Sequence, residues 1–281
     1  MTETSITRAR AAYRASQRSR SGWRRSIPLA LASLPLLLFL LLPLVALMLR
    51  VNLERLLANL RDSAVTQAIG LSLITTALTV LITVVAGTPV AYLLARRRFR
   101  GRTALDTLID LPMVLPPSVA GIALLVAFGR RGLLGQYISA AGLEIAFTQV
   151  AVVLAQTFVA APFYVKAAVA GFAGVDRDLE QAAALDGAAP LQIFRYVTLP
   201  LAWTALFGGA VMTWARALGE FGATIIFAGN FPGRTQTMPL AIYLGFELEL
   251  NLALTLSVIL LGTSFAVLFV VKGVLRQHIK A

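Results

Sequence analysis

An arginine and a glutamate lie four residues apart inside a mostly apolar part of this chain. Arg216 and Glu220 belong to the stretch ARALGEFGATIIFAGN. Residues at i and i+4 share one face of a helix, so these two side chains can pair. Ionisable groups at membrane depth are costly and normally face the interior of a helix bundle or a wet cavity. Two roles stay open: a border of an anion pathway or its outer gate, or a structural ion pair that locks one helix to its neighbours.

The chain lacks the residues that other chemistry would need. A P-loop requires a lysine followed by Ser or Thr after a glycine-rich turn, and Lys166 and Lys280 precede alanine while Lys272 precedes glycine. There is no cysteine, and the one histidine, His278, lies in the C-terminal tail. We therefore expect no enzyme activity, no metal site and no cofactor bound by this chain.

Composition decides which elements must position these residues. The chain is 58% hydrophobic and 14% charged, with a mean hydropathy of +0.80, whereas soluble domains are about one quarter charged. Several runs reach the roughly 20 apolar residues that cross a bilayer as a helix. The net charge of +12 comes from basic residues beside the ends of these runs, a pattern typical of membrane topology and not of a nucleic-acid-binding face. The sequence predicts an all-α polytopic membrane protein with lipid around it.

Hydropathy predicts about six transmembrane helices. A basic cytoplasmic tail over 1–26 precedes a first transmembrane helix over 27–50, and a core of five further helices covers 66–275. We expect these five spans near Thr66–Ala95, Leu111–Phe128, Thr148–Ala170, from Leu199 onward, and Leu252–Val271. Three prolines in LPMVLPPSVAG, at the start of the second of them, predict a break or kink there.

Basic residues indicate the orientation. Seven arginines lie in the first 26 residues and five more in ARRRFRGR, from 95 to 102. Since Lys and Arg are enriched in cytoplasmic loops, both termini are predicted in the cytoplasm. We interpret ARRRFRGR as a determinant of topology, although a basic edge could also meet lipid phosphates.

One polar stretch separates the fourth and fifth predicted spans and is therefore cytoplasmic. It reads LEQAAALDGAAPLQIFRYVTLP, Leu179–Pro200. Asp176 or Asp178 can cap a first helix, and Gly187 can end it. Pro190 suits the first position of a second helix. On that helix Leu191, Phe194 and Val197 are expected on one face, and Pro200 is expected to open the fifth span.

This stretch resembles the cytoplasmic EAA loop of the importer permeases of the ABC family. Its pattern is Glu-Ala-Ala, three residues, Gly, nine residues, Ile, any residue, Leu-Pro. Gln181 stands where the family has Glu, although Glu180 precedes it and could supply the charge. The resemblance assigns to a coupling loop over 171–198 and its continuation the residues Glu180, Gln181, Ala182, Ala183, Asp186, Gly187, Leu199 and Pro200.

The resemblance also implies an assembly in the bacterial cytoplasmic membrane. Two copies of the chain would form a homodimer around a central pathway. Two separate ATP-binding subunits, which carry ATP and Mg²⁺, would dock on the coupling loops and drive alternating access. An extracytoplasmic binding protein would deliver the substrate. An amphipathic connector lying on the membrane is the alternative for the loop, but its first helix is acidic where such connectors are basic.

A second resemblance concerns the cargo. LGEFGAT followed by GNFPGRTQTMPLAIY is similar to the molybdate permeases, and LPMVLPPSVAG is also similar to theirs. This implies import of an oxyanion, molybdate or tungstate. The related sulfate and thiosulfate permeases share the Gly-Glu-Phe/Tyr-Gly core and stay an alternative, as does a self-sufficient secondary transporter or channel. The candidate outer-gate residues are Arg216, Glu220, Asn230, Arg234 and Thr235.

Overall fold

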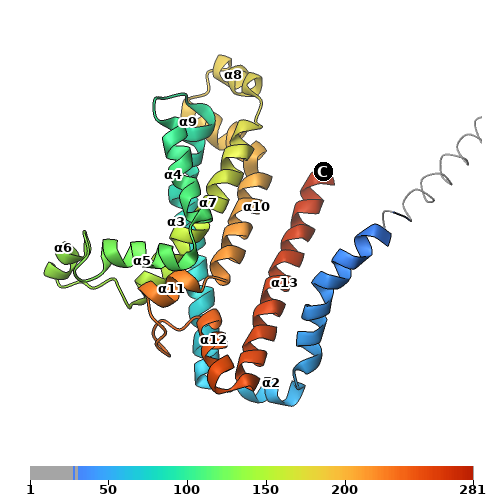
Figure 1. Ribbon diagram of the computed structural model, residues 1–281. Helices are drawn as coiled ribbons and strands as arrows, with labels where there is room; N and C mark the ends of the chain where they lie inside the picture. The colour runs from blue at the N-terminus through green and yellow to red at the C-terminus, as the bar shows by residue number, and fades with distance from the viewer. Residues whose placement is uncertain (1–27, 29–30, 281) are drawn as a thin grey trace, which may run out of the picture. The chain divides into compact units, whose positions relative to one another are not determined.

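The computed structural model of the chain describes residues 28 and 31–280, and every regular element in these residues is helical (Figure 1). The predicted basic tail over 1–26 lies outside the described residues. The chain divides into two compact units, residues 1–52 and 53–281. In the first unit, Leu31–Arg50 is an apolar helix of 20 residues with a mean hydropathy of 2.6. A helix that is hydrophobic on all sides and this long is typical of a membrane span.

The second unit is built around long apolar helices. Asp62 begins the first of them, because its Oδ1 accepts a 2.8 Å hydrogen bond from the Ala64 amide. Among the residues that the structure describes, five helices are long and apolar enough to cross a membrane, or six if a bent pair counts as one span. The long helices of this unit are α3 (Ser63–Arg96), α7 (Gln149–Ala173), α10 (Leu199–Leu218) and α13 (Leu250–Lys280), and the shorter ones include α2 (Leu53–Asn59), α6 (Gly135–Ala140) and α12 (Met238–Leu248).

The predicted third span is bent sharply where the prolines fall. Helix α4 (Arg102–Val114) is followed by helix α5 (Pro117–Phe128), and the chain bends by 116° between them. Leu115 is extended between them, with φ −66° and ψ 136°, because a residue before proline is disfavoured in the α region. The break is therefore confirmed, and the helical part begins at Arg102 and not at Leu111.

Helices α3, α7 and α10 pack against one another along much of their length. Small residues at the contacts allow this approach. A Cβ at Gly209 of α10 would lie 2.7 Å from the Cβ of Ala167, and one at Gly87 of α3 would lie 3.0 Å from a Tyr164 ring carbon.

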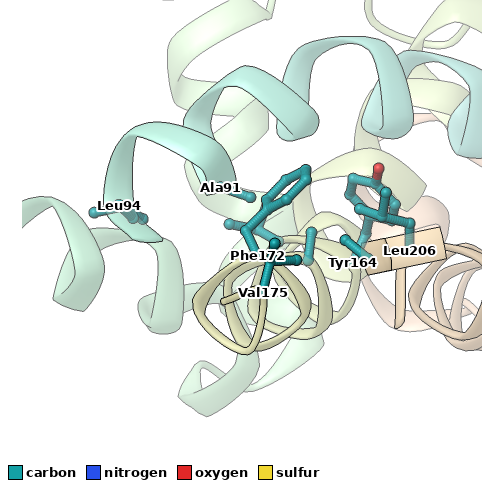
Figure 2. Close-up of a cluster of buried hydrophobic side chains, with 9 residues drawn as sticks. Ala91, Leu94, Tyr164, Phe172, Val175 and Leu206 are labelled. Carbon is teal, nitrogen blue, oxygen red and sulfur yellow. The ribbon is translucent and has the colours of Figure 1, made fainter. Parts of the chain in front are cut away.

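A buried apolar cluster joins these three helices (Figure 2). Tyr164 and Phe172 of α7 are its largest buried side chains. The Tyr164 hydroxyl lies 2.6 Å from the Thr88 hydroxyl of α3, so the polar end of the ring is satisfied. The cluster lies at the end of α7 from which the polar stretch emerges and packs that end against α3 and α10.

Candidate functional site

The polar stretch folds into a short helix followed by a tight turn. Helix α8 (Arg177–Leu185) is capped by Asp176, whose Oδ1 accepts a 3.0 Å hydrogen bond from the Asp178 amide. Gly187 follows the helix with φ 86°, a left-handed conformation that glycine adopts without strain. The Ala188 amide then donates to the Ala183 carbonyl at 3.0 Å. Both ends of this helix lie where the capping residues predict.

The second helix of the stretch does not end before the membrane. Helix α9 (Pro190–Ile193) starts at proline and passes into the π-helical turn η1 (Phe194–Thr198), which joins α10 directly. The Leu199 amide donates to the Phe194 carbonyl five residues earlier. Pro200 was expected to open a new span, but it lies in the first turn of α10 within a continuous helix from Pro190 to Leu218. The wider turn keeps the helix unbroken just before a residue that has no amide hydrogen to donate.

Most of α8 and the start of α9 face solvent. The exposed fractions are 50% for Leu179, 88% for Leu185 and 75% for Leu191. Leu191, Phe194 and Val197 were expected on one face of this helix; Leu191 is exposed, whereas Ile193, Phe194 and Val197 are partly covered. Phe194 does pack inward, with its ring centroid 5.2 Å from that of Tyr92. The loop therefore leaves three leucine side chains uncovered among its polar residues.

Glu180 is the charged residue of α8 that turns inward. Its Oε1 lies 2.9 Å from Nη2 of Arg96 and accepts a 2.6 Å hydrogen bond from the Thr198 hydroxyl. The same Arg96 nitrogen donates to the Val175 carbonyl at 3.1 Å. The exposed fractions of the Arg96 and Glu180 side chains are 8% and 19%, while Gln181 is exposed.

Arg96 therefore has a structural contact that the sequence did not reveal. It was interpreted together with its neighbours as a topology determinant only, but its side chain is held by α8 and by the end of α7. Arg97, the next residue, is exposed. No local pattern distinguishes the two arginines, because the partner Glu180 is 84 residues away in the chain.

Arg216 and Glu220 pair at the other end of α10. Arg216 Nη1 lies 2.7 Å from Glu220 Oε2, as the i,i+4 spacing predicts. Glu220 is 1% exposed, and its Oε1 accepts a 2.9 Å hydrogen bond from the Ala223 amide in helix α11 (Gly222–Phe227). The glutamate thus ties α10 to α11, while the Arg216 side chain is 29% exposed.

The loop that follows α11 uses much of its polarity internally. The Thr235 hydroxyl is buried, donates to the Gly229 carbonyl at 3.3 Å and accepts from the Phe231 amide at 3.1 Å. Asn230 Nδ2 donates to the Leu240 carbonyl at 3.3 Å. Arg234 is exposed. The structure thus places the first two inside the turn and leaves the guanidinium of Arg234 accessible.

A further charged cluster joins α4 to α7. Lys166 Nζ lies 2.7 Å from Asp106 Oδ1 and 2.8 Å from Asp110 Oδ2. The two acids are four residues apart on α4, so one lysine can meet both. Asp106 was not identified from the sequence as a partner of Lys166, although its spacing of four residues from Asp110 places both acids on one helix face.

Comparison with known proteins identifies the family to which this helical chain belongs. The family model described as "Binding-protein-dependent transport system inner membrane component" matches residues 87–279. The chain belongs to this family. It is therefore a multi-pass inner-membrane component of a transport system, consistent with the several apolar helices described above.

Two relatives of this chain are named as permease proteins of molybdenum transport systems. The chain is 45% identical over 224 residues to the molybdenum transport system permease protein ModB of Mycobacterium tuberculosis, a match that covers 80% of this chain and 85% of that protein. It is 41% identical over 194 residues to the putative molybdenum transport system permease protein YvgM of Bacillus subtilis, covering 68% of this chain and 86% of that protein.

Solved structures share the fold at low identity. A bacterial ABC transporter that imports the acidic polysaccharide alginate matches with a TM-score of 0.69 at 15% identity, over 95% of this chain and 99% of that one. The MetNI methionine ABC transporter matches with a TM-score of 0.58 at 20% identity, over 76% of this chain and 95% of that one. The fold of the chain is that of an ABC importer permease.

Proposed function

We propose that this chain is the permease subunit of an ABC importer that moves an oxyanion, molybdate or tungstate, into the cytoplasm. Two copies would form a homodimer, with two ATP-binding subunits below and an extracytoplasmic oxyanion-binding protein above. The relatives named for molybdenum transport support the cargo, together with the stretch PGRTQTMPLAIY.

The observation that carries the proposal is the exposure of α8. Seven of its nine residues are exposed, and only Glu180 and Ala183 are partly covered. A helix with exposed leucines that is anchored by an inward-facing ion pair has the form of a docking element. With no P-loop lysine in the chain, the ATPase that uses this surface must be a separate subunit.

The orientation follows from the same end of the bundle. Helix α3 ends at Arg96, α7 ends at Ala173, and α8 lies between α7 and α10. Since the arginines of ARRRFRGR cluster at this end, it would face the cytoplasm, and both termini of the chain would lie there too. The loop 129–148 before α7 and the loop after α11 would face outward.

Of the candidate gate residues, we assign contact with the passing anion to Arg216 and Arg234. Arg234 is exposed and the Arg216 side chain is 29% exposed, and a guanidinium suits a divalent oxyanion. Glu220, Asn230 and Thr235 would shape the outer end of the bundle instead, since their polar atoms bond within the fold.

Uptake by the reconstituted complex tests the proposal. The chain would be reconstituted in proteoliposomes with its ATP-binding subunits inside and its binding protein outside. ATP would be enclosed in the lumen, and the entry of radiolabelled molybdate would be measured. We expect ATP-dependent uptake that excess tungstate inhibits and excess sulfate does not. Inhibition by sulfate as strong as by tungstate would favour the sulfate permeases, and uptake by the chain alone would contradict an ABC importer.

A pair of leucine variants tests the docking surface. Leu185→Asp places a charge on the exposed end of α8, whereas Leu143→Asp changes a leucine that is 65% exposed in the loop before α7. We expect the ATP-binding subunits to be lost from the purified complex only with Leu185→Asp. Equal retention in both variants would show that α8 is not where they bind.

A further inference from the structure

We propose that Arg96, Glu180 and Thr198 form a transmission clamp that makes α8 move as one body with α3 and α10. Glu180 is a positioning residue in this clamp and does not contact the ATP-binding subunit. The inference rests on the proposed function, because it concerns how motion of α8 reaches the membrane-spanning helices.

The geometry of Glu180 supports this role. One carboxylate oxygen receives Nη2 of Arg96 from the end of α3 and the hydroxyl of Thr198 from η1, at 2.9 Å and 2.6 Å. The same Arg96 nitrogen reaches the Val175 carbonyl, just beyond α7. The end of α3 and the turn η1 therefore meet at Glu180, and Arg96 links the segment after α7 to the same site. Charge-assisted hydrogen bonds of this kind are short and directional, so they resist sliding of α8 over the bundle.

Burial makes the clamp stiff. Thr198 is 0% exposed, and 8% of the Arg96 side chain is exposed. Removing one partner of such a pair leaves the other charge uncompensated in a poorly solvated place. The rest of α8 has little contact with the bundle, since Ala183 is its only other partly covered residue. A force applied to α8 is therefore transmitted mainly through Glu180.

The clamp connects to the outer end of the bundle through a single helix. Thr198 ends η1, and α10 continues from it without a break to Leu218. At ~1.5 Å per residue, the 20 residues of α10 reach about 30 Å, to the Arg216–Glu220 pair. Glu180 at one end and Glu220 at the other thus hold the two ends of one rigid element.

The pairing of Glu180 within the chain also argues against direct contact between this residue and the ATPase. An acid at this motif position could serve as a partner for a basic residue of an ATPase. Here the motif position holds the exposed, neutral Gln181, and the neighbouring Glu180 is already paired within the chain. The ATP-binding subunit would consequently meet an amide at this position, and not a carboxylate.

The test compares two adjacent arginines in the reconstituted complex. Arg96→Gln and Arg97→Gln remove the same charge from the same loop, so any effect on membrane topology is matched. The measurement is molybdate transported per ATP hydrolysed, with the amount of co-purified ATP-binding subunit recorded in parallel. For Arg96→Gln we expect a fall of about tenfold, within the usual range of coupling between sites, with the ATP-binding subunits still bound. Arg97→Gln should behave as the wild type.

Three further variants keep the test decisive. The exchange Arg96→Glu with Glu180→Arg should recover part of the lost ratio, which a general loss of stability would not do. Thr198→Val removes only the hydroxyl, so it should lower the ratio even if Arg96→Gln fails to fold. An unchanged ratio in both Arg96→Gln and Thr198→Val would overturn the clamp. So would loss of the ATP-binding subunits from Glu180→Gln but not from Arg96→Gln, because that outcome indicates direct contact. A wild-type complex that neither assembles nor transports would instead refute the proposed function itself.

Discussion

At the residue scale, neighbouring glycines of α10 have different surroundings. A Cβ at Gly209 would lie 2.7 Å from the Cβ of Ala167 on α7, whereas a Cβ at Gly208 has no atom within 4 Å. The first glycine therefore sets the distance between two helices, and the second does not.

Alanine at these two positions should have opposite effects. We expect Gly209→Ala to lower stability by about 1–3 kcal/mol, the usual cost of overpacking. Gly208→Ala should be neutral or slightly stabilising, because alanine favours a helix over glycine by up to ~1 kcal/mol. Thermal unfolding of both variants in the same detergent measures the difference, and equal melting temperatures would contradict the close contact of α7 and α10.

The buried glutamate of the Arg216–Glu220 pair makes the arginine a structural residue as well as a candidate anion contact. Arg216→Ala would leave the carboxylate of Glu220, which is 1% exposed, without its charge partner. We expect a loss of about 3 kcal/mol and a lower yield of assembled protein. Arg216→Lys keeps the charge and should restore assembly.

Transport by these two variants separates the roles of Arg216. If Arg216→Lys assembles normally but transports less molybdate, the guanidinium also acts on the anion. If it transports as the wild type, the residue serves only to hold α10 against α11. Full assembly of Arg216→Ala would contradict the structural role.

At the element scale, the turn after α8 depends on backbone conformation and not on space. Gly187 has φ 86°, and a Cβ there would meet no atom within 4 Å. A side chain would therefore fit, but most residues would be strained by roughly 1–2 kcal/mol in this left-handed region. Asparagine tolerates the region and is an accepted alternative at the end of a helix.

This difference predicts the outcome of two substitutions. Gly187→Asn should retain most transport, whereas Gly187→Val should distort the turn between α8 and α9 and abolish transport while the protein still inserts into the membrane. Uptake and membrane content measured together provide the check. Equal activity of the valine and asparagine variants would mean that the left-handed turn is not required.

At the scale of the whole molecule, the proposed orientation can be mapped chemically because the chain has no native cysteine. Leu185→Cys lies at the exposed end of α8, and Leu143→Cys lies in the exposed loop before α7. Since α7 connects the two segments as one helix of 25 residues, their labels should appear on opposite sides of the membrane. A membrane-impermeant maleimide should label residue 143 in spheroplasts, and residue 185 only in inverted membrane vesicles. The reverse pattern would overturn the orientation inferred from the arginines.

Composition and local spacing were enough to predict the class of protein and much of its local structure. Some features act through near neighbours in the chain, so their consequences could be predicted from composition and spacing. Apolar runs of membrane-spanning length predicted the long helices, and the prolines near the start of α5 predicted the break. Asp176 and Gly187 predicted the two ends of α8. The pairing of Arg216 with Glu220 is local in the same way, since the two are one helical turn apart.

Which polar residues are held inside the fold depends on contacts between distant parts of the chain. Arg96 and Arg97 have the same chemistry, and the contacts of Arg96 with Glu180 and the Val175 carbonyl distinguish them. The continuous passage from α9 into α10 through a π turn also escaped prediction, because Pro200 alone suggests the start of a helix. Such contacts join residues far apart in the chain, and their energies depend on burial and distance, which no local pattern contains.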